Sequence, residues 1–431
     1  MQIIFYHMKF YWLSILFLMV SQLHAQIVVN GVVVDAVTKK PLQGFNIYIN
    51  NTSIGTFTDE DGKFKLTVPT REKIELIISH LVYEKKVLVV KAGESANLTI
   101  EMNVKLQSLK EVVIKGKKKP SASATRNWIE LFSVNLIGNY KDVSSHCKIK
   151  NPEVLYFDYD KDTKALQVFA RRPIVVENLA LGYLIRVDLE DFIYNFKTNE
   201  VVFKYSVFYE NLPIPKPKMA LIKKKRKELY SGSNMHFMRA LYSNNLDSSG
   251  FSVYKYTSIT NLERERVYRK VLDKIEYMYA NQTNPQINIS RLFTNTDTAK
   301  YYSSVLEQDK IVSFDTVRLK ITDFTKAHKD WTLLNFNSKD TLMINYKSLP
   351  PSKLKGIANF SEISDKSDQV KKYKEERTYY LNWKSYLVFF NTEGVNVQSN
   401  GYYSNFGLFV YGDMSDRRLA GLLPFDYEPT D

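Results

Sequence analysis

The residues from Gly55 to Leu66 read GTFTDEDGKFKL and place three carboxylates, Asp59–Asp61, directly before Gly62. We interpret this acidic group as a tight connection between two strands. Gly62 would take a positive φ there, and an Asp side chain would accept hydrogen bonds from the turn backbone. A calcium loop would need further oxygen ligands, including a bidentate acid several residues on, where Lys63 and Lys65 stand instead. The stretch therefore predicts a hairpin and not a metal site.

Short strand patterns extend to both sides of this turn. Apolar and polar residues alternate with a period of two in Phe45–Ile49, Phe64–Val68 and Leu98–Met102, as expected of strands with one buried face. The predicted strands span residues 27–35, 44–50, 63–68, 74–80, 84–90 and 97–102. Strands of this length and spacing predict a small antiparallel β-sandwich over residues 26–104.

The order of four segments in this region resembles the carboxypeptidase-regulatory-like domain. The segments are Val32–Asp35, Pro41–Ile49, Gly55–Asp59 and Gly62–Phe64. The resemblance implies a transthyretin-like sandwich of seven strands, common at the N-terminus of envelope proteins of Bacteroidota. It implies no activity, because in metallocarboxypeptidases this module is an accessory domain and not the catalyst.

The N-terminus has the pattern of a secretory signal peptide. A single basic residue, Lys9, precedes the apolar run Tyr11–Val20, and Leu23–Ala25 resembles a cleavage site. We therefore expect residues 1–25 to be removed from an exported protein that lies in the periplasm, at the outer membrane or at the cell surface. Their removal takes away one lysine and no acid, so the mature chain stays almost as basic as the formal net charge of +14. Cys147 is the only cysteine, which excludes an intramolecular disulfide.

The rest of the chain predicts a second, larger domain. Leu109–Ile114 resembles the stretch that follows the module in TonB-dependent transporters, but about 310 remaining residues are too few for a plug and a large barrel. Residues 105–124 are rich in lysine and are expected to form a solvated linker. Residues 125–431 predict a strand-dominated α+β domain, with helices over Asn127–Ile137 and Asn261–Asn281. The predicted strands there are 155–159, 165–170, 182–195, 201–208, 312–321, 341–346, 378–390, 394–399 and 406–411.

Three blocks of this second region have a familiar pattern. They resemble blocks in exported proteins of the same phylum that follow the same sandwich module and have no known activity. The blocks are Glu177–Tyr183, Tyr230–Leu241 and Leu422–Tyr427. The resemblance supports one shared architecture and assigns no role to any residue.

The motifs of common hydrolases are missing from the sequence. It contains neither H-E-x-x-H nor G-x-S-x-G, and His80, His146, His236 and His328 stand apart from one another. Cys147 follows His146 directly, but neighbouring residues on a strand point to opposite faces, so we expect an unreactive thiol. We predict no catalytic residue, no metal ligand and no cofactor.

Seven cations within twelve residues form the main charge feature. A helix is expected from Met219 onward, and Ser233 is expected to cap a following helix over Met235–Tyr242. The run is either an ordinary solvated face or a docking patch for anionic lipid headgroups, lipopolysaccharide or an acidic protein. It lacks the interleaved aromatic residues that single-stranded nucleic acid would need. The cations are Lys216, Lys218, Lys223, Lys224, Lys225, Arg226 and Lys227.

Two further patterns concern sugars. Thr298, Thr316 and Thr341 each follow an Asp and precede an aliphatic residue, which resembles the acceptors for O-glycosylation of exported proteins in Bacteroidota. The aromatic clusters Tyr156–Tyr159 and Tyr402–Phe406 suit either sugar stacking or ordinary strand packing.

Together these observations favour a non-catalytic exported envelope protein that binds or docks a protein or glycan partner. A peptide or glycan hydrolase whose carboxylates meet only in three dimensions is the first alternative, because glycoside cleavage needs two acids at the right separation and no sequence motif. An accessory subunit of an outer-membrane transporter is the second. The ligand, the membrane face and the oligomeric state stay open at this point.

Overall fold

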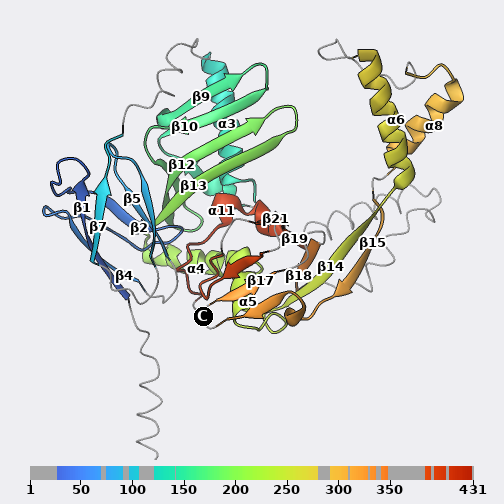
Figure 1. The fold of residues 1–431 in the computed structure, drawn as a ribbon. Coiled ribbons are helices and arrows are strands. Elements are labelled where there is room, and N and C mark those ends of the chain that lie inside the picture. The colour runs from blue at the N-terminus through green and yellow to red at the C-terminus, as the bar shows by residue number, and fades with distance from the viewer. Residues whose placement is uncertain are drawn as a thin grey trace, which may run out of the picture. The chain divides into compact units, whose positions relative to one another are not determined.

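The computed structural model describes residues 27–68, 74–90, 97–105, 121–140, 142–279, 292–308, 311–328, 331–335, 341–347, 384–389, 393–403 and 407–429. The chain forms two compact units (Figure 1), which we call unit 1, Met1–Ser231 with Arg417–Asp431, and unit 2, Gly232–Asp416. The predicted signal peptide and residues 106–120 of the predicted linker lie outside the described residues. Among the residues that the model covers, no helix is long and apolar enough to cross a membrane.

Unit 1 begins with a sandwich of seven strands, which confirms the predicted N-terminal fold. One sheet has the strand order β4-β1-β7 and the other has the order β3-β2-β5-β6. The strands are β1 (Ile27–Asp35), β2 (Asn46–Ile49), β3 (Gly55–Phe57), β4 (Lys63–Val68), β5 (Ile74–Ser79), β6 (Lys86–Val90) and β7 (Asn97–Met102).

The sandwich departs from the prediction in two details. Strand β3 was not predicted, because three residues are too few to show a period. Strands β1 and β7 pair in parallel, so the sandwich is mixed and not purely antiparallel. Alternation predicts which face a residue occupies but not the direction of the neighbouring strand.

The acidic turn forms as predicted. Asp59 Oδ1 accepts hydrogen bonds from the backbone N–H groups of Asp61 at 3.0 Å and Lys63 at 2.8 Å. Gly62 has a φ of +70°, and its carbonyl accepts a hydrogen bond from the Val33 N–H at 2.8 Å. The carboxylate of Asp59 thus holds the turn. The prediction of a hairpin is wrong, however, because β3 and β4 belong to different sheets and the turn leads from one sheet of the sandwich to the other.

Unit 1 also contains a six-stranded sheet outside the sandwich, which we call the second sheet. It contains β8 (Cys147–Ile149), β9 (Leu155–Asp160), β10 (Ala165–Ala170), β11 (Ile174–Asn178), β12 (Tyr183–Asn195) and β13 (Glu200–Asn211). The long strand β12 pairs with β11 and β10 along one edge and with β13 along the other. Helix α3 (Ala122–Ile137) packs on this sheet, where the rings of Phe132 and Phe192 lie 4.9 Å apart. The helix begins inside the predicted linker, since Ser121 caps it.

The sandwich packs directly against this second sheet. The Asn51 N–H donates to the Val207 carbonyl at 2.8 Å, and the Tyr209 N–H donates to the Thr52 carbonyl at 3.0 Å. The Tyr48 hydroxyl donates to Asp188 at 2.5 Å. Main-chain bonds therefore join the β2–β3 connection to β13, and the two layers belong to one compact unit.

Unit 2 is built around a five-stranded antiparallel sheet of order β15-β14-β18-β19-β21. These strands are β14 (Phe251–Thr260), β15 (Ile311–Arg318), β18 (Thr341–Tyr346), β19 (Lys384–Phe389) and β21 (Leu408–Gly412). A smaller sheet has the order β16-β17-β20, with β16 (Thr325–Ala327), β17 (Thr332–Leu334) and β20 (Val395–Val397). The helices are α5 (Asn234–Tyr242), α6 (Leu262–Tyr279), α8 (Thr296–Glu307) and α10 (Asp413–Asp416).

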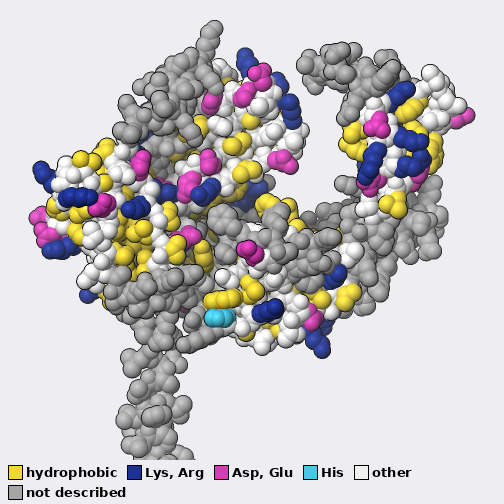
Figure 2. Space-filling model, in the orientation of Figure 1, with side chains coloured by type: hydrophobic (Ala, Val, Ile, Leu, Met, Phe, Trp, Pro, Cys, Tyr) yellow, Lys and Arg dark blue, Asp and Glu magenta, His cyan; other side chains and the backbone are white. Residues whose placement is uncertain are grey.

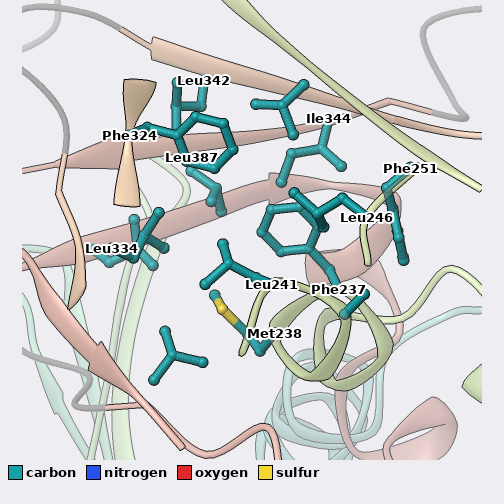
Figure 3. Packing of buried hydrophobic residues seen from close by; sticks show 14 of the residues in the cluster. Phe237, Met238, Leu241, Leu246, Phe251, Phe324, Leu334, Leu342, Ile344 and Leu387 are labelled. Carbon is teal, nitrogen blue, oxygen red and sulfur yellow. The ribbon is translucent and has the colours of Figure 1, made fainter. Parts of the chain in front are cut away.

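The core of unit 2 lies between α5 and these sheets. Figure 3 shows Phe237, Met238 and Leu241 of α5 directed toward Leu342 and Leu387 of the five-stranded sheet. All five side chains are buried. The predicted cap is present as well, because the hydroxyl of Ser233 accepts a hydrogen bond from the His236 N–H at 3.0 Å.

The division into units differs from the single domain expected over residues 125–431. The boundary falls after Ser231, and the chain returns to unit 1 at Arg417. Asn178 donates to the carbonyl of Ala420 in α11 (Arg418–Gly421) at 2.9 Å, and the Phe425 N–H donates to the Asn51 carbonyl at 2.8 Å. The last described residues thus pack on both layers of unit 1, a long-range contact that composition and periodicity cannot reveal.

Candidate functional site

Helix α4 (Lys216–Tyr230) carries the cationic run found in the sequence. The helix starts three residues earlier than the predicted Met219, because Pro217 fits the first turn, where a backbone N–H has no helical partner. Ile222 and Leu229 are buried and lie on one side of the helix. This side fixes α4 on unit 1.

Four lysines occupy the opposite side of α4, and we call this set the lysine face. With 100° per residue, Lys216, Lys223, Lys224 and Lys227 fall within about a third of the helix circumference. All four side chains are exposed. Within the described part of the chain, Lys216, Lys223 and Lys224 form no ion pair.

The charges of α6 provide a contrast. Figure 2 shows Lys and Arg side chains interspersed with Asp and Glu along α6 and α8. On α6, Arg266 pairs with Glu263 and Arg269 pairs with Glu265 at 2.7 Å. The hydrogen bond from Arg266, the largest cause, holds the pKa of Glu263 at about 2. Arg266 and Arg269 thus pair with acids of their own helix, whereas Lys216, Lys223 and Lys224 form no ion pair within the described residues.

Two other cations of the run stabilise the fold. Lys225 pairs with Asp142 at 3.3 Å and with Glu228 at 3.1 Å. The Arg226 Nε donates to the Leu181 carbonyl at 2.8 Å, and its guanidinium lies 3.9 Å from the ring centre of Tyr183. The seven cations therefore separate into a structural pair and an exposed set, while Lys218 is exposed but points away from the lysine face.

A hollow of about 280 Å³ lies beside α4, and we call it the α4 hollow. Its lining comes from distant parts of unit 1: the β2–β3 connection, β12, β13, α4 and the C-terminal segment. Lys223 and Arg226 from the predicted run line it together with Ser53, Tyr183, Asn211 and Asp426.

Sequence reasoning missed most of this hollow. Tyr183 and Asp426 lie in the blocks Glu177–Tyr183 and Leu422–Tyr427, which were singled out by their pattern but received no role. Their meeting depends on the return of the chain to unit 1, and no local pattern encodes that return. Ser53 gave no signal in the sequence.

A larger and more open hollow of about 610 Å³ lies on the sandwich, over residues of β1, β3, β4 and β7. Gly31 in its floor is required for packing, since a Cβ there would lie 2.6 Å from both the Leu98 carbonyl oxygen and the Phe64 ring. Phe57 at its side is 65% exposed. The remaining polar residues are those of ordinary strand surfaces, and they converge on no common point.

The other candidates from the sequence lie apart from these hollows. The Cys147 thiol donates to the Val143 carbonyl at 3.5 Å, and burial raises its pKa to about 12, which leaves it protonated at neutral pH. The His146 Nδ1 lies 2.9 Å from the Asp142 carbonyl oxygen. Among the residues that the model covers, no three His, Cys, Asp or Glu side chains gather as metal ligands would.

The three threonines with the acceptor pattern all belong to unit 2. Thr298 lies in the first turn of α8, where its N–H donates to Asn295. Thr316 lies on β15, and Thr341 starts the central strand β18. Glycosylation at these positions stays a prediction.

The two aromatic clusters have different surroundings. The Trp128 ring of α3 lies 5.8 Å from Phe157 and 6.0 Å from Tyr159, and the Arg171 guanidinium lies 3.7 Å from the Tyr156 ring centre. The first cluster thus takes part in strand and helix packing. In the second, Tyr403 packs against the core of unit 2, while residues 404–406 lie outside the described residues.

Comparison with known families supports the fold of the first layer. A family model described as CarboxypepD_reg-like domain matches residues 29–114. The sandwich is a carboxypeptidase-regulatory-like domain. The match ends before the second sheet, the α4 hollow and unit 2, so this domain name describes only the first part of the chain.

Two curated relatives match about a fifth of the chain. A TonB-dependent receptor of Formosa agariphila is 33% identical over 99 residues, which cover 22% of this chain and 9% of that protein. The TonB-dependent receptor SusC of Bacteroides thetaiotaomicron is 32% identical over 101 residues, which cover 23% of this chain and 9% of that protein. The chain thus matches less than a tenth of the length of either relative.

Among solved structures, a 9R-lipoxygenase from Cyanothece PCC8801 matches with a TM-score of 0.14 and 11% sequence identity. The match covers 52% of this chain and 48% of that chain. Similarity at this level supports no inference about fold or function.

Proposed function

We propose that this protein is a non-catalytic, exported component of the cell envelope that docks an anionic partner, a protein or a glycan, through the lysine face of α4. The single observation that supports this proposal most is that Lys216, Lys223 and Lys224 lie exposed on one side of α4 and form no ion pair within the described part of the chain. On a helix whose charged residues serve only to keep its surface hydrated, lysines and arginines are usually interspersed with acids, as they are on α6.

The electrostatics favour a partner of opposite charge. The chain carries a formal net charge of +14, so its overall field attracts anions, and the lysine face concentrates that field on one surface. Exposed charges are screened over about 8 Å at physiological ionic strength. Binding through the lysine face should therefore weaken steeply as salt is added.

The location in the envelope rests on two further observations. The N-terminal pattern is that of a secretory signal peptide. About a fifth of the chain is similar to TonB-dependent receptors of Formosa agariphila and Bacteroides thetaiotaomicron. The similarity to these receptors also favours a more specific role, that of an accessory module of a TonB-dependent receptor.

The test is binding of the purified chain to envelope fractions from its own cells, measured by co-sedimentation. We expect Lys216→Glu/Lys224→Glu to weaken binding by about tenfold, because each surface charge contributes about 0.2–1 kcal/mol and reversal adds repulsion. The matched control is Lys40→Glu/Lys161→Glu, which makes the same charge change at exposed positions outside α4.

Equal loss of binding in both double variants would show that net charge alone matters and would contradict a defined docking face. Crosslinking of the bound wild-type chain, followed by identification of the partner, distinguishes an accessory module of a TonB-dependent receptor from a protein that docks another anionic partner. Recovery of a TonB-dependent receptor supports the accessory role, and recovery of another anionic component supports the general one.

A further inference from the structure

Tyr183 is a buried residue of unit 1 whose hydroxyl has no partner within the described part of the chain. Tyr183 is 3% exposed and lines the α4 hollow. Its ring packs edge-on against Tyr209, with 5.5 Å between centres, and under the guanidinium of Arg226. Its hydroxyl makes no hydrogen bond within the described part of the chain. The hydroxyl oxygen is not among the fully buried polar atoms that lack a partner, so it is accessible from the hollow that Tyr183 lines and is available to a ligand.

Burial of Tyr183 raises the pKa of its phenol to about 12. The hydroxyl therefore keeps its proton at neutral pH and can donate a hydrogen bond. The donor lies beside two cations, Arg226 and Lys223, that line the same hollow.

Arg226 is held in place as a fixed cation. It donates to the Leu181 carbonyl at 2.8 Å, to the Gly182 carbonyl at 3.5 Å and to the Asn211 side-chain oxygen at 3.3 Å. None of these acceptors carries a charge, and a guanidinium has five N–H donors, so donors remain for another group. Lys223 adds a second, exposed cation at the same wall.

Two acids, Asp426 and Glu428, also line the hollow. Asp426 accepts hydrogen bonds from the N–H of Ser53 at 2.8 Å and from the Ser53 hydroxyl. A carboxylate has about four acceptor positions, so about two remain. The charge of Asp426 raises the pKa of Tyr183, and the charge of Arg226 lowers it. Within the described part of the chain, neither Arg226 nor Lys223 forms an ion pair with Asp426. Side chains of opposite charge thus line one hollow.

We propose that the α4 hollow binds a small zwitterion of amino-acid size. Its carboxylate would be held by Arg226 and Lys223, with the Tyr183 hydroxyl as a further donor, and its ammonium group would face Asp426. The volume of about 280 Å³ lies at the small end of ligand sites and suits a molecule of this size. This inference goes beyond the proposed function, which concerns a large partner on the outer lysine face.

The experiment is isothermal titration of the full chain with alanine, and separately with propionate and ethylamine, which carry only one of the two charges. We expect alanine to bind at least about tenfold more tightly than either, because only alanine pairs with side chains of both charges. Tyr183→Phe keeps the ring and the contact with Arg226 but removes the donor, and it should weaken alanine binding by about three- to tenfold.

Tyr205→Phe is the matched control, because it removes the hydroxyl of another tyrosine of the same sheet, on β13, that does not line the hollow. It should leave alanine binding unchanged. Since the Tyr183 hydroxyl has no partner in the described residues, its removal should also leave the melting temperature unchanged, so lost binding cannot be attributed to unfolding.

Three results would overturn the proposal: no heat of binding with alanine, equal affinity for alanine and propionate, or equal losses in the two tyrosine variants. If inorganic phosphate bound as tightly as alanine, the site would be one for anions alone, and the proposal of a zwitterionic ligand would be wrong. Tyr183→Phe leaves every lysine of α4 in place, so its envelope binding should equal that of the wild type whether or not the hollow binds alanine.

Discussion

Gly62 is the residue on which the acidic turn depends. Its φ is +70°, and a Cβ there would lie 2.6 Å from the Val33 carbonyl oxygen, which is itself bonded within the sandwich. We expect Gly62→Ala to lower the local unfolding free energy of β1 and β4 by about 2–3 kcal/mol, from the left-handed backbone and the clash together. Hydrogen exchange of the amides in these strands measures the change.

Gly44→Ala is the control for that substitution. Gly44 has a φ of +79°, but a Cβ there would meet no atom within 4 Å. It should therefore show only the backbone cost of about 1 kcal/mol. Equal effects at the two glycines would mean that the close approach to Val33 does not matter.

At the scale of the element, α5 depends on Ser233, the residue just before its first turn. The Ser233 hydroxyl caps the helix, and α5 supplies four side chains to the core of unit 2. We expect Ser233→Ala to lower the free energy of unfolding of unit 2 by about 1 kcal/mol, because the partly buried N–H of His236 loses its acceptor. Urea denaturation, followed by circular dichroism, measures the loss.

Ser233→Asn should restore most of that stability, since an asparagine oxygen is also a good cap. Ser243→Ala, at the exposed C-terminal end of the same helix, should change little, because the Ser243 side chain makes no hydrogen bond in the described residues. A loss as large at Ser243 as at Ser233 would argue that helix propensity and not capping is responsible.

Helix α4 shows how far a pattern predicts an element. The sequence predicted a cationic helix, which is confirmed, and it treated the seven cations as one set. Their division depends on neighbours from elsewhere in unit 1, such as Asp142 and Leu181, which hold Lys225 and Arg226. Local sequence determined the helix, but tertiary contacts determined which charges remain available.

At the scale of the whole molecule, Glu190 links the sandwich to the second sheet. Lys85 of the sandwich pairs with Glu190 at 2.5 Å, and Lys204 of β13 pairs with it at 2.6 Å. Burial alone would raise the pKa of Glu190, but the hydrogen bonds and charges of the two lysines outweigh it and hold the pKa below its ordinary value of 4.5. Ionised Glu190 therefore stabilises unit 1 above pH 4.5, and this contribution is lost as the pH falls through the lowered pKa.

We expect Glu190→Gln to lower the free energy of unfolding of unit 1 by about 1 kcal/mol at pH 7 and to have a smaller effect below the lowered pKa. Urea titrations from pH 7 down to acid, followed by the fluorescence of Trp128 in α3, give both values. Glu130→Gln on the exposed side of α3 is the control and should show no such trend. A loss at Glu190 that stays constant with pH would contradict the role of its charge.

The sequence by itself determined the local structure of this protein. Alternation of apolar residues, the Asp59–Gly62 turn and the helical period predicted the sandwich, most later strands and the helices α3, α4, α5 and α6, because neighbours in sequence set these features. Only the tertiary structure decided that the chain divides at Ser231 and Arg417, that the sandwich packs on β13 through its own backbone, and that Tyr183, Arg226 and Asp426 share one hollow. The physical reason is that these features depend on packing between residues up to several hundred positions apart, which no period or motif in the chain records.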